Sequence, residues 1–421
     1  MSNSLIYRLD WVLIMIYLLL VTFGIINVYS ATFNEFSGDS GIFDFSYLVG
    51  KQLFFLLISI LSGIIILGIN IKFFEHFASL SYLISILLLA GLFVLGKTVS
   101  GATSWYNLGG VSLQPSELSK IGTALMIASY ISKFQSDLRK VKTLLRTSLY
   151  LFIPILLIVL QPDPGSALVF SAFFFPLFRE GLSINFLIIF VISLFLFLIS
   201  LSFEFTTSIA IIGIIILFTF FILKRLSNKI RVWPFILAFV VSVGFSFSVD
   251  YIFNNLFEQR HRDRINIVIG KEVDSRGIGY NINQSKIAIG SGGLIGKGFL
   301  KGTQTKGDFV PEQQTDYIFS TVGEEWGFLG GLFVIIMFSF LILRILKRAE
   351  KQNSKFRRVF SYAVAGLIFI HFFVNIGMSV GIVPTIGIPL PFISYGGSNL
   401  LAFSLMIFIH LNFDANRLNE W

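Results

Sequence analysis

Residues 183–203 read SINFLIIFVISLFLFLISLSF, which is 21 positions without a charged side chain. An α-helix rises about 1.5 Å per residue, so a run of this length covers the roughly 30 Å hydrocarbon core of a bilayer. Backbone N–H and C=O groups in lipid must pair within the segment, and a helix achieves this. The stretch therefore predicts a membrane-spanning helix.

Similar runs recur along the whole chain of 421 residues. The composition is 55% hydrophobic and only 13% charged, well below the quarter or so expected of soluble domains, and the mean hydropathy is +0.82. We predict an all-α integral membrane protein, a polytopic helical bundle whose single membrane domain covers residues 1–421. About twelve spans are predicted, beginning near residues 9, 48, 75, 115, 144, 165, 183, 206, 231, 316, 359 and 395. The absence of cysteine excludes disulfides, thiolate metal sites and cysteine nucleophiles.

Lysine and arginine gather in the loops of one side. The net charge is +9, and basic residues beside membrane spans are more often orientation signals than nucleic-acid contacts. If the N-terminus is cytoplasmic, most basic residues lie in cytoplasmic loops, including seven from Arg344 to Arg358, whereas the short outer loops hold only Lys51 and Lys97. We therefore predict a multi-pass protein with both termini cytoplasmic and without a nucleic-acid partner.

One outer loop, residues 253–315, is much longer than the others. It is polar, glycine-rich and charged, and loops of about sixty residues are usually either functional or disordered. Apolar positions and turn residues recur in it without low complexity. We therefore predict an ordered extracytoplasmic loop with a function.

Ionisable residues within or beside predicted spans mark candidate sites, because burying them in a membrane is unfavourable. Gln114 and Pro115 precede Glu117 and Lys120, whose spacing of three places both on one helix face. A site and a salt-bridged helix start are both consistent with this pattern. Asp163, between two prolines, fits either a site or a rigid turn with a capping carboxylate.

Asp316 lies where the long loop is predicted to enter the membrane. Partial desolvation makes a carboxylate a stronger base, which is what a general base requires. A helix N-cap would produce the same pattern. The sequence leaves both interpretations open.

Several motifs together resemble the SEDS family (shape, elongation, division and sporulation) over nearly the whole chain. They are Trp105, Gln114–Glu117, Gln161–Asp163, Gln284–Gly293, Pro311–Asp316 and Pro389–Ser398. Gly302–Gln304 and the Glu324–Gly327 run are more similar to the elongation member than to the division member of the family.

The resemblance implies a bacterial peptidoglycan glycosyltransferase of the cytoplasmic membrane. Such an enzyme polymerises lipid II on the outer face and works with a class B penicillin-binding protein, a transpeptidase, within the elongation machinery. By the same resemblance, Asp316 matches the essential aspartate and Lys120 the lysine of the central cavity. Contacts with substrate are predicted for Trp105, Gln114, Glu117, Asp163, Arg262, Glu312 and Ser394.

The reaction needs a base for the attacking hydroxyl and cations for the departing pyrophosphate. We assign the base to Asp316, and Lys120 either orients it or contacts phosphate. No cofactor is established by the sequence. A divalent cation, Mg²⁺ or Mn²⁺, is a hypothesis that Glu312, Asp316 and Glu324 would serve.

The chain departs from the family pattern in two places. Family members usually have ten spans, and residues 206–250 read as an additional helix pair. Ser104 and Ser112 stand where relatives often have arginine.

Other functions compete with the enzyme. A lipid-linked oligosaccharide flippase would also place charges in its core, and a scaffold that only recruits the transpeptidase would not need them. The division-type paralogue is a third alternative.

Overall fold

The computed structural model describes residues 5–33, 47–99, 101–109, 111–133, 137–227, 230–255, 259–270 and 278–417. The helices begin with α1 (Leu5–Arg8), α2 (Trp11–Thr32), α3 (Leu48–Gly68), α4 (Ile71–Leu95), α5 (Pro115–Ser132), α6 (Val141–Val159), α7 (Pro164–Val169), η1 (Phe170–Phe173) and α8 (Phe174–Arg179). They continue with α9 (Ile184–Ser202), α10 (Phe205–Leu226), α11 (Trp233–Asn255), α12 (Gln259–Ile269), α13 (Ile278–Ser291), α14 (Thr303–Lys306), α15 (Ile318–Ala349), α16 (Lys355–Val380) and α17 (Gly397–Ala415). The strands are β1 (Lys97–Val99), β2 (Ala102–Leu108) and β3 (Val111–Leu113).

Ten helices in the described part of the chain are long and apolar enough to cross a membrane: α2, α3, α4, α6, α9, α10, α11, α15, α16 and α17. The predicted all-α, polytopic membrane protein is therefore confirmed, and every predicted span begins within four residues of a helix start. The count of twelve is not confirmed. The other two predicted spans are α5, which carries Glu117 and Lys120, and the short broken segment α7–η1–α8.

The chain divides into two compact units. The first contains residues 1–182 and 281–421, and the second contains residues 183–280. Within the second unit, α9 packs with α10 and α11, and Ser200 Oγ donates to Ser246 Oγ at 2.8 Å. The predicted helix pair of residues 206–250 corresponds to α10 and α11. Its status as an addition to a ten-span core, and the extent of the membrane domain, stay predictions.

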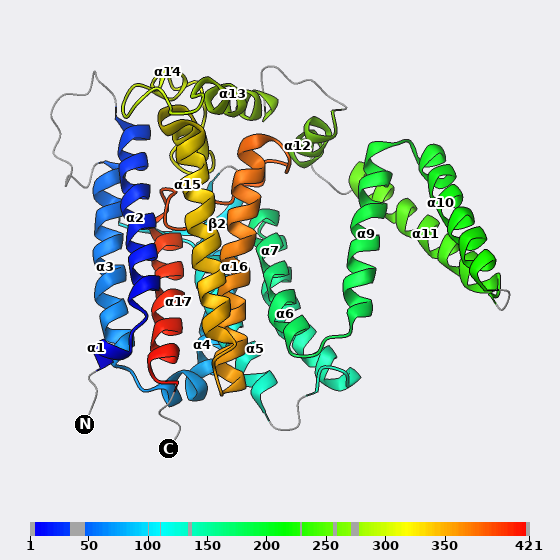
Figure 1. Cartoon of the computed structure of the whole chain (residues 1–421), viewed down its shortest axis with the longest axis horizontal. Helices are drawn as coiled ribbons and strands as arrows, with labels where there is room; N and C mark the ends of the chain where they lie inside the picture. The colour runs from blue at the N-terminus through cyan, green and yellow to red at the C-terminus, as the bar shows by residue number, and fades with distance from the viewer. Residues whose placement is uncertain are drawn as a thin grey trace. The chain divides into compact units, whose positions relative to one another are not determined.

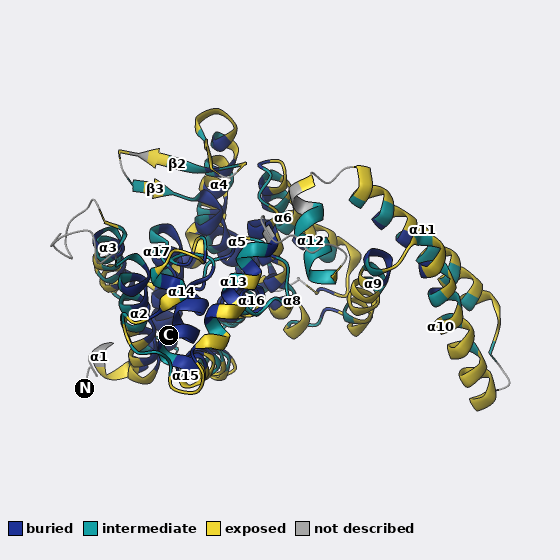
Figure 2. Ribbon diagram, turned by 90° about the horizontal axis from the view of Figure 1, so that it is seen from above, coloured by how far each residue is buried: buried dark blue, intermediate teal, exposed yellow. Residues whose placement is uncertain are grey.

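The core of the first unit lies around α5, α16 and α17, where buried residues concentrate (Figure 2). α2 approaches the loop before α17 so closely that a Cβ on Gly24 would lie 2.3 Å from the Phe392 carbonyl oxygen. Only glycine fits there. The close approach holds the segment that precedes α17 against the bundle.

A small antiparallel sheet connects α4 to α5, and the sequence pattern did not predict it. In the sheet, Lys97 of β1 lies opposite Trp105 of β2. The Tyr106 hydroxyl donates to the Leu88 carbonyl of α4 at 2.8 Å. The sheet is therefore anchored to α4 and directs the chain into α5 at Pro115.

The part of the predicted long loop that the structure describes is largely helical, with α12, α13 and α14 inside it. α13 and α14 lie at the end of the first unit opposite α1 (Figure 1). The Ser285 hydroxyl of α13 donates to the Ser379 carbonyl near the end of α16 at 2.8 Å. This hydrogen bond holds α13 at the end of α16.

Asp10 connects three helix ends at the opposite side of the first unit. Its carboxylate caps α2 by accepting from Leu13 N, and it accepts from Arg344 Nε at 2.7 Å and from Arg348 Nε at 2.6 Å. Arg348 also lies 3.5 Å from the Asp414 carboxylate at the end of α17. The start of α2 and the ends of α15 and α17 therefore meet at one charge cluster.

Asp10→Asn should destabilise the protein at neutral pH and remove part of its acid sensitivity. Burial raises the pKa of Asp10, but the hydrogen bonds from Arg344 and Arg348 outweigh burial and lower this pKa from 3.8 to about 2. A lowered pKa stabilises the fold above pH 3.8 by about 2 kcal/mol, and this contribution is lost as the pH falls toward 2. Thermal unfolding in detergent at pH 7 and pH 3 measures both effects. The exposed Asp137→Asn is the control, and equal melting of both variants at pH 7 would contradict the assignment.

Candidate active site

The pair Glu117 and Lys120 is buried in the first two turns of α5. Pro115 occupies the first helical position, where its missing N–H is not needed. Glu117 Oε1 and Lys120 Nζ are 2.6 Å apart, and the two side chains are only 3% and 1% exposed. The predicted shared helix face is confirmed, and the pair lies inside the protein. Buried charges need additional hydrogen-bond partners, because desolvation is unfavourable for both.

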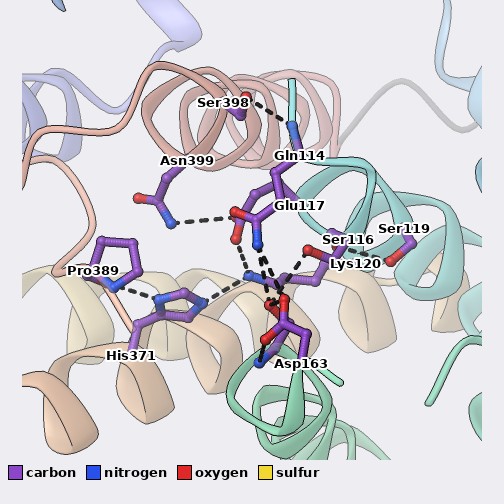
Figure 3. A network of polar contacts seen from close by, with 11 residues as sticks. Gln114, Ser116, Glu117, Ser119, Lys120, Asp163, His371, Pro389, Ser398 and Asn399 are labelled. Carbon is purple, nitrogen blue, oxygen red and sulfur yellow. Dashed lines mark hydrogen bonds and ion pairs between the residues drawn. The ribbon is translucent and has the colours of Figure 1, made fainter. Parts of the chain in front are cut away.

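α16 and α17 supply these partners, and Figure 3 shows the chain of contacts. Lys120 Nζ lies 2.9 Å from His371 Nε2, and His371 Nδ1 lies 3.0 Å from the Pro389 carbonyl oxygen. Asn399 Nδ2 donates to Glu117 Oε2 at 3.3 Å. An ammonium only donates and a carbonyl only accepts, so His371 is neutral with its proton on Nδ1.

A second polar cluster adjoins the first through Gln114. Gln114 Nε2 lies 3.3 Å from both Asp163 Oδ2 and Ser166 Oγ, and Ser166 Oγ donates to Asp163 Oδ2 at 2.8 Å. Asp163 Oδ1 also caps α7 by accepting from Ser166 N at 3.0 Å. Asp163 is therefore both a capping residue and a member of the polar network, so the two interpretations of its motif are compatible.

The backbone beside Asp316 is hydrogen-bonded to the loop that precedes α17. Tyr395 N donates to the Gln314 carbonyl at 2.8 Å, and the Ser394 hydroxyl donates to the Thr315 carbonyl at 2.6 Å. Two segments about eighty residues apart in sequence are thereby held side by side. The position of Asp316 follows from this pairing.

Asp316 itself is partly exposed, and its carbonyl accepts from Asn375 Nδ2 of α16 at 2.9 Å. The N-cap of α15 is Tyr317, so Asp316 does not occupy the capping position. Asn375 Nδ2 also donates to the Ile388 carbonyl at 2.8 Å. On the other side, a Cβ built on Gly387 would lie 3.4 Å from Asp316 Oδ2. The carboxylate therefore faces a position without a side chain.

The other predicted residues of the first unit have different surroundings. Ser394 is buried and accepts from Leu390 N at 2.8 Å, so it fixes the loop. Trp105 is half-buried in β2. Glu312 is exposed in the left-handed region, φ 54°, and its carboxylate accepts from the Thr315 hydroxyl at 3.0 Å. Their contacts with substrate stay predictions.

Arg262 belongs to the second unit, where its Nη1 donates to the Asn254 carbonyl at 3.1 Å. Its predicted contact with pyrophosphate stays a prediction. Ser104 is buried in β2.

The divalent-cation hypothesis also stays a prediction. Among the residues that the structure describes, no three His, Asp or Glu side chains form a group that could hold a metal ion. The Glu324 carboxylate is engaged elsewhere, with Lys297 Nζ at 2.7 Å and the backbone N–H groups of Thr303 and Gln304 at 2.8 and 2.9 Å. The acidic trio named by the hypothesis therefore does not form one group in the described structure.

Three polar side chains of the site were not predicted: His371 and Asn399, which contact the buried charges, and Asn375, which donates to the Asp316 carbonyl. Their polar side chains lie inside apolar helices, which is a signal of a site in membrane proteins. His371 and Asn375 are four residues apart and thus share one face of α16. That spacing could have been found in the sequence, although the partners of these residues could not.

The comparisons with known proteins agree with the motifs. Residues 10–208 and 186–419 match the FtsW, RodA and SpoVE family, described as cell cycle protein. Together the two matches cover nearly the whole chain. The chain therefore belongs to this family, and the SEDS resemblance is confirmed.

Individual relatives carry both elongation and division names. Peptidoglycan glycosyltransferase MrdB of Escherichia coli (strain K12) is 35% identical over 344 residues, covering 80% of this chain and 79% of its own. Peptidoglycan glycosyltransferase RodA of Treponema pallidum is 31% identical over 435 residues, covering 97% of this chain and 98% of its own. Probable peptidoglycan glycosyltransferase FtsW of Trichlorobacter lovleyi is 30% identical over 410 residues, covering 96% and 93%.

Solved structures share the fold. One chain, from a study of how a peptidoglycan synthase complex coordinates polymerization and crosslinking, aligns with a TM-score of 0.71 at 24% identity, covering 98% of this chain and 99% of its own. The crystal structure of Thermus thermophilus RodA aligns with a TM-score of 0.62 at 23% identity and covers 97% of both chains.

Proposed function

We propose that this protein is a peptidoglycan glycosyltransferase that polymerises lipid II into glycan strands. The observation that carries the proposal is the position of Asp316, a partly exposed carboxylate whose backbone is held by Asn375 and whose neighbour is held by Ser394. The names of the E. coli and Treponema relatives support the same activity.

The proposed reaction joins two lipid-linked disaccharides. The 4-hydroxyl oxygen of a GlcNAc attacks the anomeric carbon of a MurNAc, and a new glycosidic bond forms. The bond from that carbon to undecaprenyl pyrophosphate breaks, and the electron pair leaves with the pyrophosphate. The hydroxyl proton must pass to a base.

Asp316 is the base in this proposal. The Gly387 backbone lies beside its carboxylate without adding a side chain, and the Asp316 backbone carbonyl accepts a hydrogen bond from Asn375. Fixing a base in place removes the entropy of orienting it, which is a large part of catalysis by proximity. A long loop whose backbone is held in place where it ends at a carboxylate favours an enzyme over a transporter.

Lys120 has the orienting role rather than a phosphate contact. Its side chain is 1% exposed, and its ammonium already binds Glu117 and His371. A buried ammonium still acts on charges beyond its contacts, because the low dielectric of the interior weakens an electric field less than water does.

Cell elongation is the cellular role that we propose, with the division role as the alternative. The two elongation-like motifs form one structural feature: the Glu324 carboxylate accepts from the backbone of Thr303 and Gln304. A substitution of Glu324 would therefore remove hydrogen bonds from the backbone of Thr303 and Gln304.

The partner in this proposal is a class B penicillin-binding protein that cross-links the strands. A structural neighbour comes from a synthase complex that couples polymerization with crosslinking, which supports such a pairing. We place the protein in the bacterial cytoplasmic membrane, with both termini cytoplasmic and residues 253–315 outside. Arg344 and Arg348 lie at the end of α15 opposite Glu324, and basic residues gather on the cytoplasmic side of membrane proteins, which supports this orientation.

Asp316→Asn should abolish polymer formation from purified lipid II, because the amide cannot accept the hydroxyl proton. We expect a loss of at least about 100-fold, typical of removing a general base. Gel analysis of the glycan strands, with and without the transpeptidase, measures it. Asp308→Asn, an exposed carboxylate of the same loop, is the matched control. Normal polymerisation by Asp316→Asn would contradict the role of Asp316, whereas lipid II transport across liposomes without polymer would favour the flippase.

Gly387→Ala should lower the polymerisation rate more than Gly270→Ala. Both glycines have left-handed backbones, with φ of 79° and 81°, so both substitutions introduce similar strain. Only the methyl at position 387 would contact Asp316 Oδ2, since a Cβ at Gly270 has no atom within 4 Å. The polymerisation rates of the two variants, compared at matched thermal stability, test whether the reaction uses the space beside the Asp316 carboxylate. Equal rates would show that this space is not used.

A further inference from the structure

One turn of α16 contacts both parts of the proposed active site. His371 and Asn375 are four residues apart on one face of the helix, and both are fully buried. His371 binds Lys120, and Asn375 binds the backbone of Asp316. Lys120 lies in α5 and Asp316 lies in the turn before α15, so α16 is a common support for both.

The same two side chains also bind consecutive carbonyls of one loop. Asn375 Nδ2 donates to the Ile388 carbonyl at 2.8 Å, and His371 Nδ1 lies 3.0 Å from the Pro389 carbonyl. This loop includes Gly387, which faces the Asp316 carboxylate. A shift of the α16 turn would therefore move the lysine, the aspartate and the loop between them together.

His371 has two separable interactions. Its Nδ1–H donates to the Pro389 carbonyl, which holds the loop, and its Nε2 accepts from the Lys120 ammonium, which holds the lysine. Among the described residues, two ionisable side chains contact the Lys120 ammonium: Glu117 and His371. The ring centroid of Phe403, in α17, lies 5.6 Å from Lys120 Nζ. Without the imidazole acceptor, Glu117 would be the one hydrogen-bond partner left to Lys120 among these described contacts.

We propose that His371 is a positioning residue of the glycosyltransferase reaction, which acts through Lys120: its unprotonated Nε2 fixes the lysine ammonium relative to Asp316. The inference rests on the proposed function. The physical reason is preorganisation, because a charge held in place before the reaction needs no reorganisation when the transition state forms. A displacement of about 1 Å at such a position lowers rates by around 100-fold.

Two amide substitutions separate the roles of the ring nitrogens. The amide of His371→Asn lies near the place of Nδ1, so it can donate to Pro389 without reaching Lys120. The amide of His371→Gln reaches the place of Nε2 and offers its oxygen to Lys120. We expect His371→Gln to keep kcat within about 5-fold of wild type, and His371→Asn to lower kcat about 100-fold with little change in KM.

His410→Gln is the matched control for losing a buried histidine. His410 is also fully buried, but it binds Ser361, ten residues before His371 and thus about 15 Å along α16. We expect this variant to polymerise lipid II normally. Thermal unfolding of all three variants in detergent accompanies the rate measurements.

The opposite order of activities, with Asn active and Gln inactive, would show that His371 only holds the Pro389 loop and would overturn the proposal. Wild-type rates in both variants would overturn it as well. Loss of activity and of thermal stability in both variants would assign His371 to packing, again overturning it. The proposed function is tested separately by comparing wild type with Asp316→Asn on the same gel. That comparison does not depend on which of the two histidine variants is more active.

Discussion

Burial of the Glu117–Lys120 pair constrains the residues around it. Removing two charges from water is unfavourable by several kcal/mol for each, and their attraction offsets this only when the remaining hydrogen-bond capacity is satisfied. Asn399 satisfies the second carboxylate oxygen, and His371 accepts from the ammonium. Three helices, α5, α16 and α17, must therefore keep a fixed register to avoid leaving a buried charge unpaired. The packing of these three helices thus keeps the charged pair satisfied.

The buried pair and the proposed base Asp316 are both held by α16. The turn of α16 that holds Lys120 also holds the Asp316 backbone through Asn375, and the loop before α17 pairs with the same segment through Ser394. Lys120 is thus held by contacts from outside α5, and Asp316, in the turn before α15, is held by contacts from α16 and from the loop before α17. This arrangement explains how a long extracytoplasmic loop can end at an accurately placed base: its last residues are bound by the rigid interior.

Hydropathy and spacing predicted the parts of this account that are local in sequence. The helix starts and the shared face of Glu117 and Lys120 follow from run length and the helical repeat. The sheet around Trp105 did not, because short strands in an outer loop have no such signal. His371 is 251 residues from Lys120, so no local pattern could pair them. The role of Asp316 came from resemblance to the family, and sequence alone left its capping interpretation open until the structure placed Tyr317 at the N-cap.

We infer that the buried pair serves the reaction rather than stability. The double variant Glu117→Leu/Lys120→Met, measured together for thermal unfolding and for lipid II polymerisation, tests it most directly. Buried ion pairs replaced by apolar side chains of similar volume often leave stability unchanged or raise it. We expect a melting temperature at or above that of the wild type and no glycan strands. Glycan strands at the wild-type rate, or a variant that no longer folds, would contradict it.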